Sequence, residues 1–338
     1  MAKRIAINGF GRIGRCIVRA MVERGVGDVE IVALNDLTSA ETLAHLYTYD
    51  TVHGRAAREA TARDGKLCID DKTIRVVAEK DPGKLPWKEL GIDIVLECTG
   101  LFTDKDKASA HLLAGAYKVI IGAPAKGHDA TIVLGVNTEA YDPAKHSVIS
   151  CGSCTTNCLA PVAKVLLDAF GLEHGLMTTT HSYTNDQALL DVPHRKGDLR
   201  RARAAAQNIV PTSSGAAKAL SEVLPSLKGK FDGQSMRVPT MDVSLVDLTF
   251  ESTRPMTRDA IHAAMKDASE GSMRDILGYT EKPLVSSDYL GDPRSSIFDA
   301  TITQMIGERF AKVFAWYDNE WGFSNRMVEL AQLVASKM

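Results

Sequence analysis

The stretch Arg4-Ile5-Ala6-Ile7-Asn8-Gly9-Phe10-Gly11-Arg12-Ile13-Gly14 decides the fold at the amino-terminal end of this 338-residue chain. It reads as an apolar strand, a Gly-x-Gly-x-x-Gly turn and the start of a helix. In a dinucleotide site, Gly9 allows the tight turn, Gly11 lets backbone approach a pyrophosphate, and Gly14 lets the helix pack closely. The alternative is a structural glycine turn before an ordinary helix.

The next apolar run strengthens the dinucleotide interpretation. It covers residues 30–35 and ends at Asp36, 22 residues after Gly14. A carboxylate at this point accepts hydrogen bonds from the adenosine ribose and repels a 2′-phosphate. The sequence therefore favours NAD over NADP.

Further apolar runs at 92–100, 117–122 and 131–137 alternate in part with helix-like segments such as 104–114. This pattern predicts a Rossmann-type α/β domain, a doubly wound parallel sheet covered on both faces. Ligands of such sheets bind at the carboxyl ends of the strands, so we expect Thr99 and Gly100 near the cofactor. Residues 55–80 fit a small antiparallel excursion less clearly.

A second motif lies midway along the chain, at Ser153-Cys154-Thr155-Thr156-Asn157. It follows a strand-like run at 146–150 and opens a helix with apolar residues at three- and four-residue spacing. The unpaired amides of a helix start favour a thiolate and can hold an oxyanion, which makes Cys154 a candidate nucleophile. The alternative is a small buried core residue.

The pattern changes after this helix. Strand-like runs at 176–183, 243–250 and 298–315 surround a long polar loop at about 184–208, and the run at 243–250 alternates. Alternation predicts a mainly antiparallel sheet with one covered face, in an α+β catalytic domain. We expect an NAD-binding domain at 1–153 and 319–338, with the last helix packing back onto it, and a catalytic domain at 154–318.

His181 ends a strand and is the best-placed acid–base partner for a thiol; the alternative is a hydrogen-bonded structural histidine. Arg237 stands in an apolar strand, and residues 211–217 offer hydroxyls at another helix start, which together suit a phosphate. The plainer interpretation of these two features is a helix cap and a solvated arginine. For the arginine cluster at 195–203, a solvated or subunit-contact surface is the stronger interpretation.

Composition and charge narrow the classes of protein to which this chain can belong. A formal net charge of -2 gives no argument for nucleic acid, and no apolar run is long enough for a membrane span. Six cysteines in this length indicate a reduced, cytoplasmic protein rather than a disulfide scaffold. The Cys151-x-x-Cys154 pair lacks the second pair of a zinc site, so no metal is predicted.

Together the glycine turn, the cysteine pentapeptide, the run from His181 to Gln187 and the run from Trp316 to Gly322 resemble the phosphorylating, NAD-dependent glyceraldehyde-3-phosphate dehydrogenases. The resemblance runs nearly from end to end. It implies that Cys154 attacks the aldehyde of glyceraldehyde 3-phosphate, that His181 activates the thiol, and that inorganic phosphate cleaves the resulting thioester to give 1,3-bisphosphoglycerate.

The resemblance also implies the binding residues. It implies that Thr184 and Arg237, with Asp186 beside them, bind the C3 phosphate of the substrate. The attacking phosphate would bind to Ser153, Thr155, Ser214 and Gly215. The residues that the resemblance assigns to the cofactor are Gly9, Gly11, Arg12, Ile13, Gly14, Asp36, Lys80, Thr99, Gly100 and Asn319. The loop at 184–208 resembles one that reaches a neighbouring subunit, so a homotetramer is expected.

Two alternatives remain at this point. Erythrose-4-phosphate dehydrogenase shares the cysteine pentapeptide, although Tyr183-Thr184-Asn185 and Thr212-Ser213-Ser214-Gly215 resemble the glyceraldehyde enzyme. A non-enzyme alternative is an NAD-binding redox sensor that uses Cys151, Cys154 and Cys158, of which Cys154 and Cys158 lie one helical turn apart.

Overall fold

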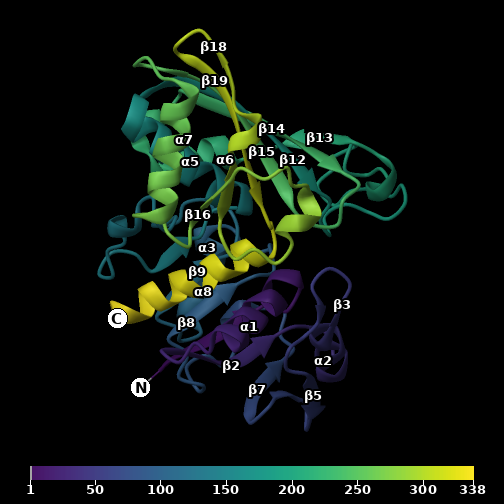
Figure 1. Cartoon of the computed structure of the whole chain (residues 1–338). Coiled ribbons are helices and arrows are strands. Elements are labelled where there is room, and N and C mark those ends of the chain that lie inside the picture. Colours follow the sequence, from purple (N-terminus) through teal and green to yellow (C-terminus); the bar gives the residue numbers. More distant parts are fainter. Residues whose placement is uncertain (1) are drawn as a thin grey trace. The chain divides into compact units, whose positions relative to one another are not determined.

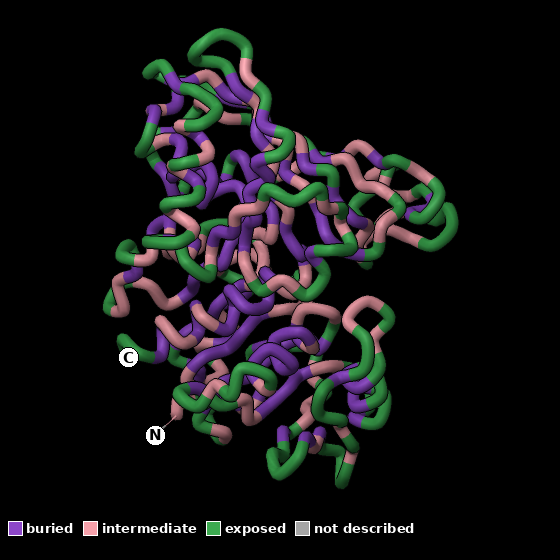
Figure 2. Tube along the Cα trace, viewed as in Figure 1, coloured by how far each residue is buried: buried purple, intermediate pink, exposed green. Residues whose placement is uncertain are grey.

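The computed structural model describes residues 2–338, which form two compact units. Unit 1 comprises Met1–Ile132, Thr138–Gly152 and Ser324–Met338, and unit 2 comprises Val133–Asn137 and Ser153–Phe323. Figure 2 shows buried residues inside each unit and exposed residues along the connecting loops.

Unit 1 is built on a nine-stranded sheet in the order β10-β11-β9-β8-β1-β2-β7-β6-β5. Neighbours from β10 to β7 pair in parallel, and β7, β6 and β5 pair antiparallel. The strands are β1 (Lys3–Asn8), β2 (Val29–Asn35), β5 (Ala60–Arg63), β6 (Lys66–Ile69), β7 (Lys72–Val77), β8 (Ile94–Glu97), β9 (Lys118–Ile121), β10 (Ala130–Thr131) and β11 (Val148–Ser150). A separate small pair is β3 (Tyr49–Asp50) with β4 (Gly54–Arg55).

Helices connect and cover this sheet: α1 (Arg12–Arg24), α2 (Ala40–Thr48), α3 (Lys105–Ala108), α4 (Ala110–Leu113) and most of α8 (Trp321–Ser336). The middle of α8 is tied to the end of α1, because Arg24 pairs with Glu329 at 2.9 Å. The parallel sheet and the antiparallel excursion at 55–80 agree with the sequence prediction.

One predicted strand is wrong. Of residues 131–137, only Thr131 lies in β10, and Val133–Asn137 form a turn that belongs to unit 2. The amide oxygen of Asn137 accepts a hydrogen bond from the Val133 backbone at 2.8 Å, and Gly135 has φ +78°. The apolar side chains of this run fill the core of unit 2 instead of a strand position.

Unit 2 holds a mainly antiparallel sheet in the order β13-β14-β12-β15-β19-β17-β16, with β18 beside β19. Its strands are β12 (Leu172–Ser182), β13 (Val210–Ser213), β14 (Phe231–Val238), β15 (Ser244–Ser252), β16 (Leu277–Thr280), β17 (Ser296–Asp299), β18 (Gln304–Ile306) and β19 (Phe310–Tyr317). Buried and part-exposed residues alternate along β15, as the period-two pattern predicts for one covered face.

Three helices cover that face: α5 (Cys154–Phe170), α6 (Ala216–Val223) and α7 (Arg258–Glu270) (Figure 1). The apolar residues of α5 meet those of β15 and β19 in the largest core cluster. This packing holds Cys154, the first residue of α5, close to His181 near the end of β12.

Candidate active site

Helix α5 begins at the candidate nucleophile. Ser153 is its N-cap residue, and the serine hydroxyl accepts a hydrogen bond of 3.0 Å from the Thr156 backbone N–H. A cap at this position fixes the first turn of the helix and leaves Cys154 at its start. The Ser153 hydroxyl therefore caps the helix, in addition to whatever ligand it binds.

The thiol of Cys154 faces the imidazole of His181. Sγ lies 3.5 Å from Nε2, and the opposite ring nitrogen, Nδ1, lies 2.7 Å from the carbonyl oxygen of Ser182. A carbonyl can only accept, so we assign the ring proton to Nδ1. Nε2 then presents its lone pair to the thiol, which is the tautomer that a general base needs.

Burial controls the protonation of this pair. Burial raises the pKa of the Cys154 thiol to about 11, although the Arg237 charge and hydrogen bonds from Thr155 lower it. Burial and the Arg237 charge lower the pKa of His181 to about 3. The resting pair is therefore a neutral thiol and a neutral imidazole. Burial therefore opposes the thiolate that the amides at the helix start favour.

Arg237, at the end of β14, joins the histidine to the polar loop. Its Nη1 donates to the Ser182 carbonyl at 3.1 Å and to the Thr184 hydroxyl at 3.0 Å, and lies 3.3 Å from His181 Nδ1. The Thr184 hydroxyl in turn donates to Asp186. Burial raises the pKa of the Asp186 carboxyl, but Thr184, Arg237 and Arg201 lower it below its usual value. These groups form a part-buried cationic corner that suits a phosphate.

Arg201 is a member of this corner that the sequence analysis did not single out. It lies in the cluster interpreted as a solvated surface, yet only 20% of its side chain is exposed. Its Nη1 donates to Asp186 at 2.5 Å and its Nε donates to the Thr212 hydroxyl at 2.8 Å. This arginine is not fully solvated in the single chain, and no local pattern distinguishes it from its exposed neighbours such as Arg203.

Tyr317 supports the reacting pair from the end of β19 and was also missed. Its ring meets the His181 ring edge to face, with centroids 5.9 Å apart. Its hydroxyl lies 2.8 Å from the hydroxyls of both Thr155 and Thr179. The Thr155 hydroxyl is thus held by a buried tyrosine. Burial at the end of an alternating strand was the available signal for Tyr317.

Asn319 follows closely after this strand. Its amide oxygen accepts hydrogen bonds of 2.7 Å from the hydroxyls of Ser182 and Ser244. Because two donors bind the oxygen, the amide is fixed with its NH₂ group on the opposite side. Asn319 is therefore a preset hydrogen-bond donor two positions beyond Tyr317.

Ser214 and Gly215 precede helix α6. The Ser214 hydroxyl accepts from the Ala216 backbone N–H at 3.3 Å. A Cβ built on Gly215, the N-cap residue of α6, meets no atom within 4 Å, so this helix start is open. Both residues follow Thr212, which binds Arg201, but no hydrogen bond joins them to Cys154 or His181 in the described part of the chain.

The glycine turn lies in unit 1 between β1 and α1, and each glycine has a separate steric reason. Gly9 has φ +94°, and a Cβ there would lie 2.8 Å from the Thr99 backbone nitrogen. A Cβ on Gly14 would lie 2.4 Å from the Gly9 carbonyl oxygen, whereas one on Gly11 would meet nothing within 4 Å. The open backbone at Gly11, beside the start of a 13-residue helix, fits a pyrophosphate.

Two carboxylates order this turn. Asp36, after β2, accepts from the Phe10 backbone N–H at 2.9 Å and from the Thr38 N–H at 3.0 Å. Asp50 forms a two-pronged ion pair with the Arg12 guanidinium, with N–O distances of 2.6 and 3.0 Å. The Arg12 side chain is therefore engaged with Asp50, while its backbone and that of Ile13 belong to the first turn of α1.

The remaining predicted cofactor residues lie near the same sheet edge or on the surface. Thr99 is part-exposed beyond the carboxyl end of β8 and donates to Glu97 from its backbone N–H at 2.8 Å. Gly100 follows it with φ +67° and is exposed. Lys80 is exposed after β7.

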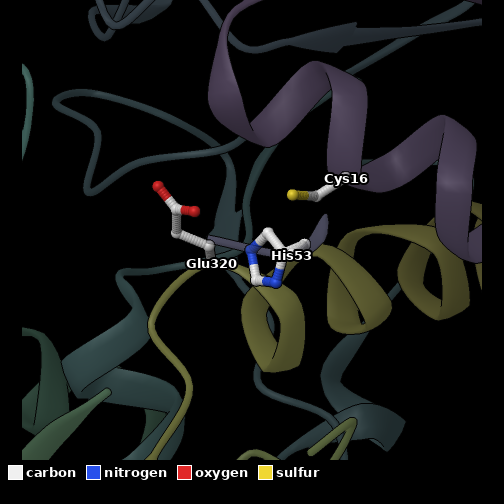
Figure 3. Close-up of side chains that lie close together, drawn as sticks. All are labelled: Cys16, His53 and Glu320. Atoms are coloured by element: carbon white, nitrogen blue, oxygen red, sulfur yellow. The ribbon is translucent and has the colours of Figure 1, made fainter. Parts of the chain in front are cut away.

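Two potential metal ligands in unit 1 do not amount to a site. Figure 3 labels Cys16, which lies on α1, and His53, and these two residues have ligand atoms within 4.8 Å of each other. Two ligands within one unit are fewer than zinc sites use. We therefore assign no metal to these residues.

Comparison with known proteins gives full-length similarity. Residues 3–105 match the family described as glyceraldehyde 3-phosphate dehydrogenase, NAD binding domain, and residues 153–319 match its C-terminal domain. Glyceraldehyde-3-phosphate dehydrogenase 2 of Streptomyces avermitilis is 55% identical over 338 residues, all of both chains. Glyceraldehyde-3-phosphate dehydrogenase 1 of Bacillus subtilis and the enzyme of Geobacillus stearothermophilus are each 56% identical over 337 residues, covering 100% of this chain and 99% of theirs.

Proposed function

The chain belongs to the glyceraldehyde-3-phosphate dehydrogenase family, and from this premise we propose how its own residues carry the reaction. It is an NAD-dependent enzyme that oxidises glyceraldehyde 3-phosphate with inorganic phosphate to 1,3-bisphosphoglycerate. The observation that carries the proposal is the 3.5 Å approach of Cys154 Sγ to the unprotonated nitrogen of His181.

The first step forms a carbon–sulfur bond. His181 accepts the thiol proton at Nε2 while Cys154 Sγ attacks the aldehyde carbon. The histidine then returns this proton to the new oxyanion, which gives the thiohemiacetal and leaves Nε2 free again. Two features support this assignment: Nδ1 of the histidine is held by the Ser182 carbonyl, and the Thr155 groups bond to the sulfur. The same helix-start amides stabilise the oxyanion.

NAD, when bound, supplies the hydride acceptor for the oxidation. During that step His181 takes the hydroxyl proton of the thiohemiacetal, so a thioester remains on Cys154. A phosphate oxygen then attacks the thioester carbon, the carbon–sulfur bond breaks, and the thiol is restored with a proton returned from His181. Energy from the oxidation is retained in the acyl phosphate.

Phosphate groups bind in two places in this proposal. Arg237, Thr184 and Asp186 order the site for the substrate's C3 phosphate, and their hydrogen bonds to one another support that grouping. The attacking phosphate binds through Ser153, Thr155, Ser214 and Gly215. Arg201, which bonds to both Asp186 and Thr212, belongs between the two sets.

NAD binds at the glycine turn through Gly9, Gly11, Gly14 and the backbone of Arg12 and Ile13. Asp36 accepts hydrogen bonds from the adenosine ribose, and the NH₂ group of Asn319 donates to the nicotinamide carboxamide. Near the adenine half lie Lys80, Thr99 and Gly100. The open space above Gly11 supports the first assignment and the fixed Asn319 amide supports the last. Apart from Ser153, which we assign to the attacking phosphate, residues 1–153 and 319–338 then serve NAD, and residues 154–318 serve the substrate.

We further propose a cytoplasmic homotetramer. None of the six cysteines forms a disulfide in the described residues, which suits a reducing compartment. None of the helices in residues 2–338 has both the length and the apolar character of a membrane span. Within the loop at 184–208, Leu189, Leu190 and Leu199 are 75–84% exposed, which supports burial against another subunit. Light scattering should give about four times the chain mass of 36.6 kDa; the mass of a single chain would contradict the tetramer.

The proposal is tested by trapping the acyl-enzyme and locating it by mass spectrometry. We expect an acyl group on Cys154 that disappears when phosphate is added and does not form in Cys154→Ser. Label on Cys151 or Cys158, which are 1% and 0% exposed, would overturn the assignment. Steady-state rates with glyceraldehyde 3-phosphate and erythrose 4-phosphate complete the test. Phosphate-independent turnover that prefers the second aldehyde would contradict the assigned substrate.

A further inference from the structure

The last residues of three neighbouring parallel strands in unit 1 are polar, and they lie opposite one another. Asn8 of β1 stands opposite Asn35 of β2 on one side and Glu97 of β8 on the other. All three are buried, with exposed fractions of 1%, 6% and 1%. Asn35 Nδ2 donates to Asn8 Oδ1 at 2.7 Å, and Asn8 Nδ2 donates to Glu97 Oε2 at 2.5 Å. Hydrogen bonds thus cross the carboxyl edge of three strands.

Glu97 is the acceptor at which this network ends. Its Oε2 accepts from Asn8 and lies 3.1 Å from His111 Nε2, and its Oε1 accepts from both the backbone N–H and the hydroxyl of Thr99. Every partner presents a hydrogen to the carboxylate. This arrangement suits an ionised side chain, which accepts and does not donate.

The histidine tautomer is set from the far side of the ring. The indole N–H of Trp87 donates to His111 Nδ1 at 3.0 Å, and an indole nitrogen can only donate. His111 must therefore carry its single proton on Nε2, facing Glu97. Both side chains of this His–Glu pair are 0% exposed, so water cannot substitute for either partner.

The same carboxylate holds the residue that packs on the dinucleotide turn. Thr99 is bound to Glu97 through two hydrogen bonds, and its backbone nitrogen lies 2.8 Å from where a Cβ on Gly9 would be. At the other end of the network, the Asn35 carbonyl accepts from the Gly9 N–H at 2.8 Å. The first glycine of the turn is therefore fixed from both sides by members of one network.

We propose that Glu97 is a positioning residue for the cofactor, and that the network of Trp87, His111, Glu97, Asn8, Asn35 and Thr99 sets the shape of the NAD-binding edge. The proposal rests on the assignment of NAD to the Gly9–Gly14 turn. Glu97 itself is buried beneath Thr99 and acts through it. A network that served only to stabilise the core would change the melting temperature but not the affinity for NAD in a folded variant.

The central test is Glu97→Gln, with NAD affinity measured by calorimetry on the full chain. The glutamine NH₂ must face either the two Thr99 donors or the pair Asn8 and His111, so donors oppose donors in each orientation. We expect the NAD dissociation constant to rise about 10-fold. The matched control is Glu30→Gln at the exposed amino end of β2, which should bind like the parent chain.

A second variant tests the polarity of the network and does not depend on Glu97→Gln alone. Trp87→Phe removes the donor to His111 Nδ1, so the ring proton can move there and Nε2 can accept. In that background the glutamine side chain introduced by Glu97→Gln gains an acceptor for its NH₂ group. The cost of Glu97→Gln in NAD affinity should then shrink several-fold. Independent effects of the two substitutions would overturn the tautomer argument.

The outcomes separate this inference from the proposed function. If the parent chain fails to bind NAD, the assignment of the turn is wrong. If the parent binds NAD and Glu97→Gln, folded by circular dichroism, binds it equally well, the positioning role is wrong. A raised dissociation constant in Glu97→Gln, reduced by Trp87→Phe, supports it.

Discussion

Arg201 donates a hydrogen bond of 2.5 Å from Nη1 to the carboxylate of Asp186, fifteen residues earlier in the chain. Asp186 also accepts from Thr184, which accepts from Arg237. One carboxylate therefore orders two guanidinium groups whose like charges would otherwise repel each other. This relationship orders the side chains to which we assign the C3 phosphate of the substrate.

Substitution of Arg201 should weaken recognition of the substrate's phosphate more than it slows oxidation of the aldehyde. In Arg201→Gln, we expect KM for glyceraldehyde 3-phosphate to rise about 10-fold or more, because a charge-assisted contact is lost. Turnover of unphosphorylated glyceraldehyde should stay within about twofold of the parent. Steady-state kinetics with both aldehydes make the comparison, and Arg203→Gln, at an arginine whose side chain is 61% exposed, is the matched control. Equal losses with both aldehydes would contradict a phosphate role.

Substitution of Arg237 should change the reactivity of Cys154 without any substrate present. Burial raises the pKa of the thiol and the Arg237 charge opposes this, so removing the charge must raise that pKa further. At a fixed pH near 8, Arg237→Leu should react several-fold more slowly with iodoacetamide, since about one pKa unit changes the thiolate fraction tenfold. Arg237→Lys keeps the charge and should stay near the parent rate. An unchanged rate in the leucine variant would show that the charge is screened from the sulfur.

The serine pair at Asn319 gives a prediction about cofactor binding. Ser182→Ala and Ser244→Ala each remove one donor to the amide oxygen, and the double variant removes both. Freed from both, the amide can flip and present its oxygen to the nicotinamide carboxamide. We expect each single variant to weaken NAD binding by a few-fold and the double variant by about 10-fold, measured by calorimetry. If the double variant binds as tightly as the parent, the serines do not orient Asn319.

Local sequence was sufficient for the elements whose signal is local. The glycine turn, the helix that begins at Cys154 and the alternation along β15 each follow from short-range rules on glycine, capping and burial. The structure contains all three. The turn at 133–137 was misassigned, because an apolar run gives the same signal in a strand and in a core turn.

The parts that sequence could not supply depend on contacts between distant residues. Arg201 looks like its exposed neighbours until Asp186 and Thr212 are placed beside it. Glu97 and Asn8 are 89 residues apart, and their register becomes visible only in the folded sheet. The protonation of Cys154 also required the structure, because helix-start amides favour the thiolate while burial opposes it more strongly.

The ion pair between Arg12 and Asp50 provides a prediction on stability. Only 6% of the Asp50 side chain is exposed, and it also accepts from the backbone N–H groups of Val52 and His53. Burial raises the pKa of the Asp50 carboxyl, but Arg12 and these amides lower it further, to about 2. The folded state therefore binds this proton less readily than the unfolded state.

The sign of the pH dependence follows from that shift. The pKa of the Asp50 carboxyl falls from 3.8 to about 2 on folding. At pH values above the pKa of the unfolded state, this shift adds about 2 kcal/mol to the free energy of unfolding. This stability is fully present above about pH 5 and is lost as the pH falls towards 2. Asp50→Asn should be less stable than the parent by about that amount at pH 7 and pH 5, and the gap should narrow at pH 3. Urea unfolding at the three pH values measures it, with Asp71→Asn, at an exposed position, as control. A gap of the same size at all three values would mean that the Asp50 charge is not its source, and that packing or the amide hydrogen bonds hold the loop instead.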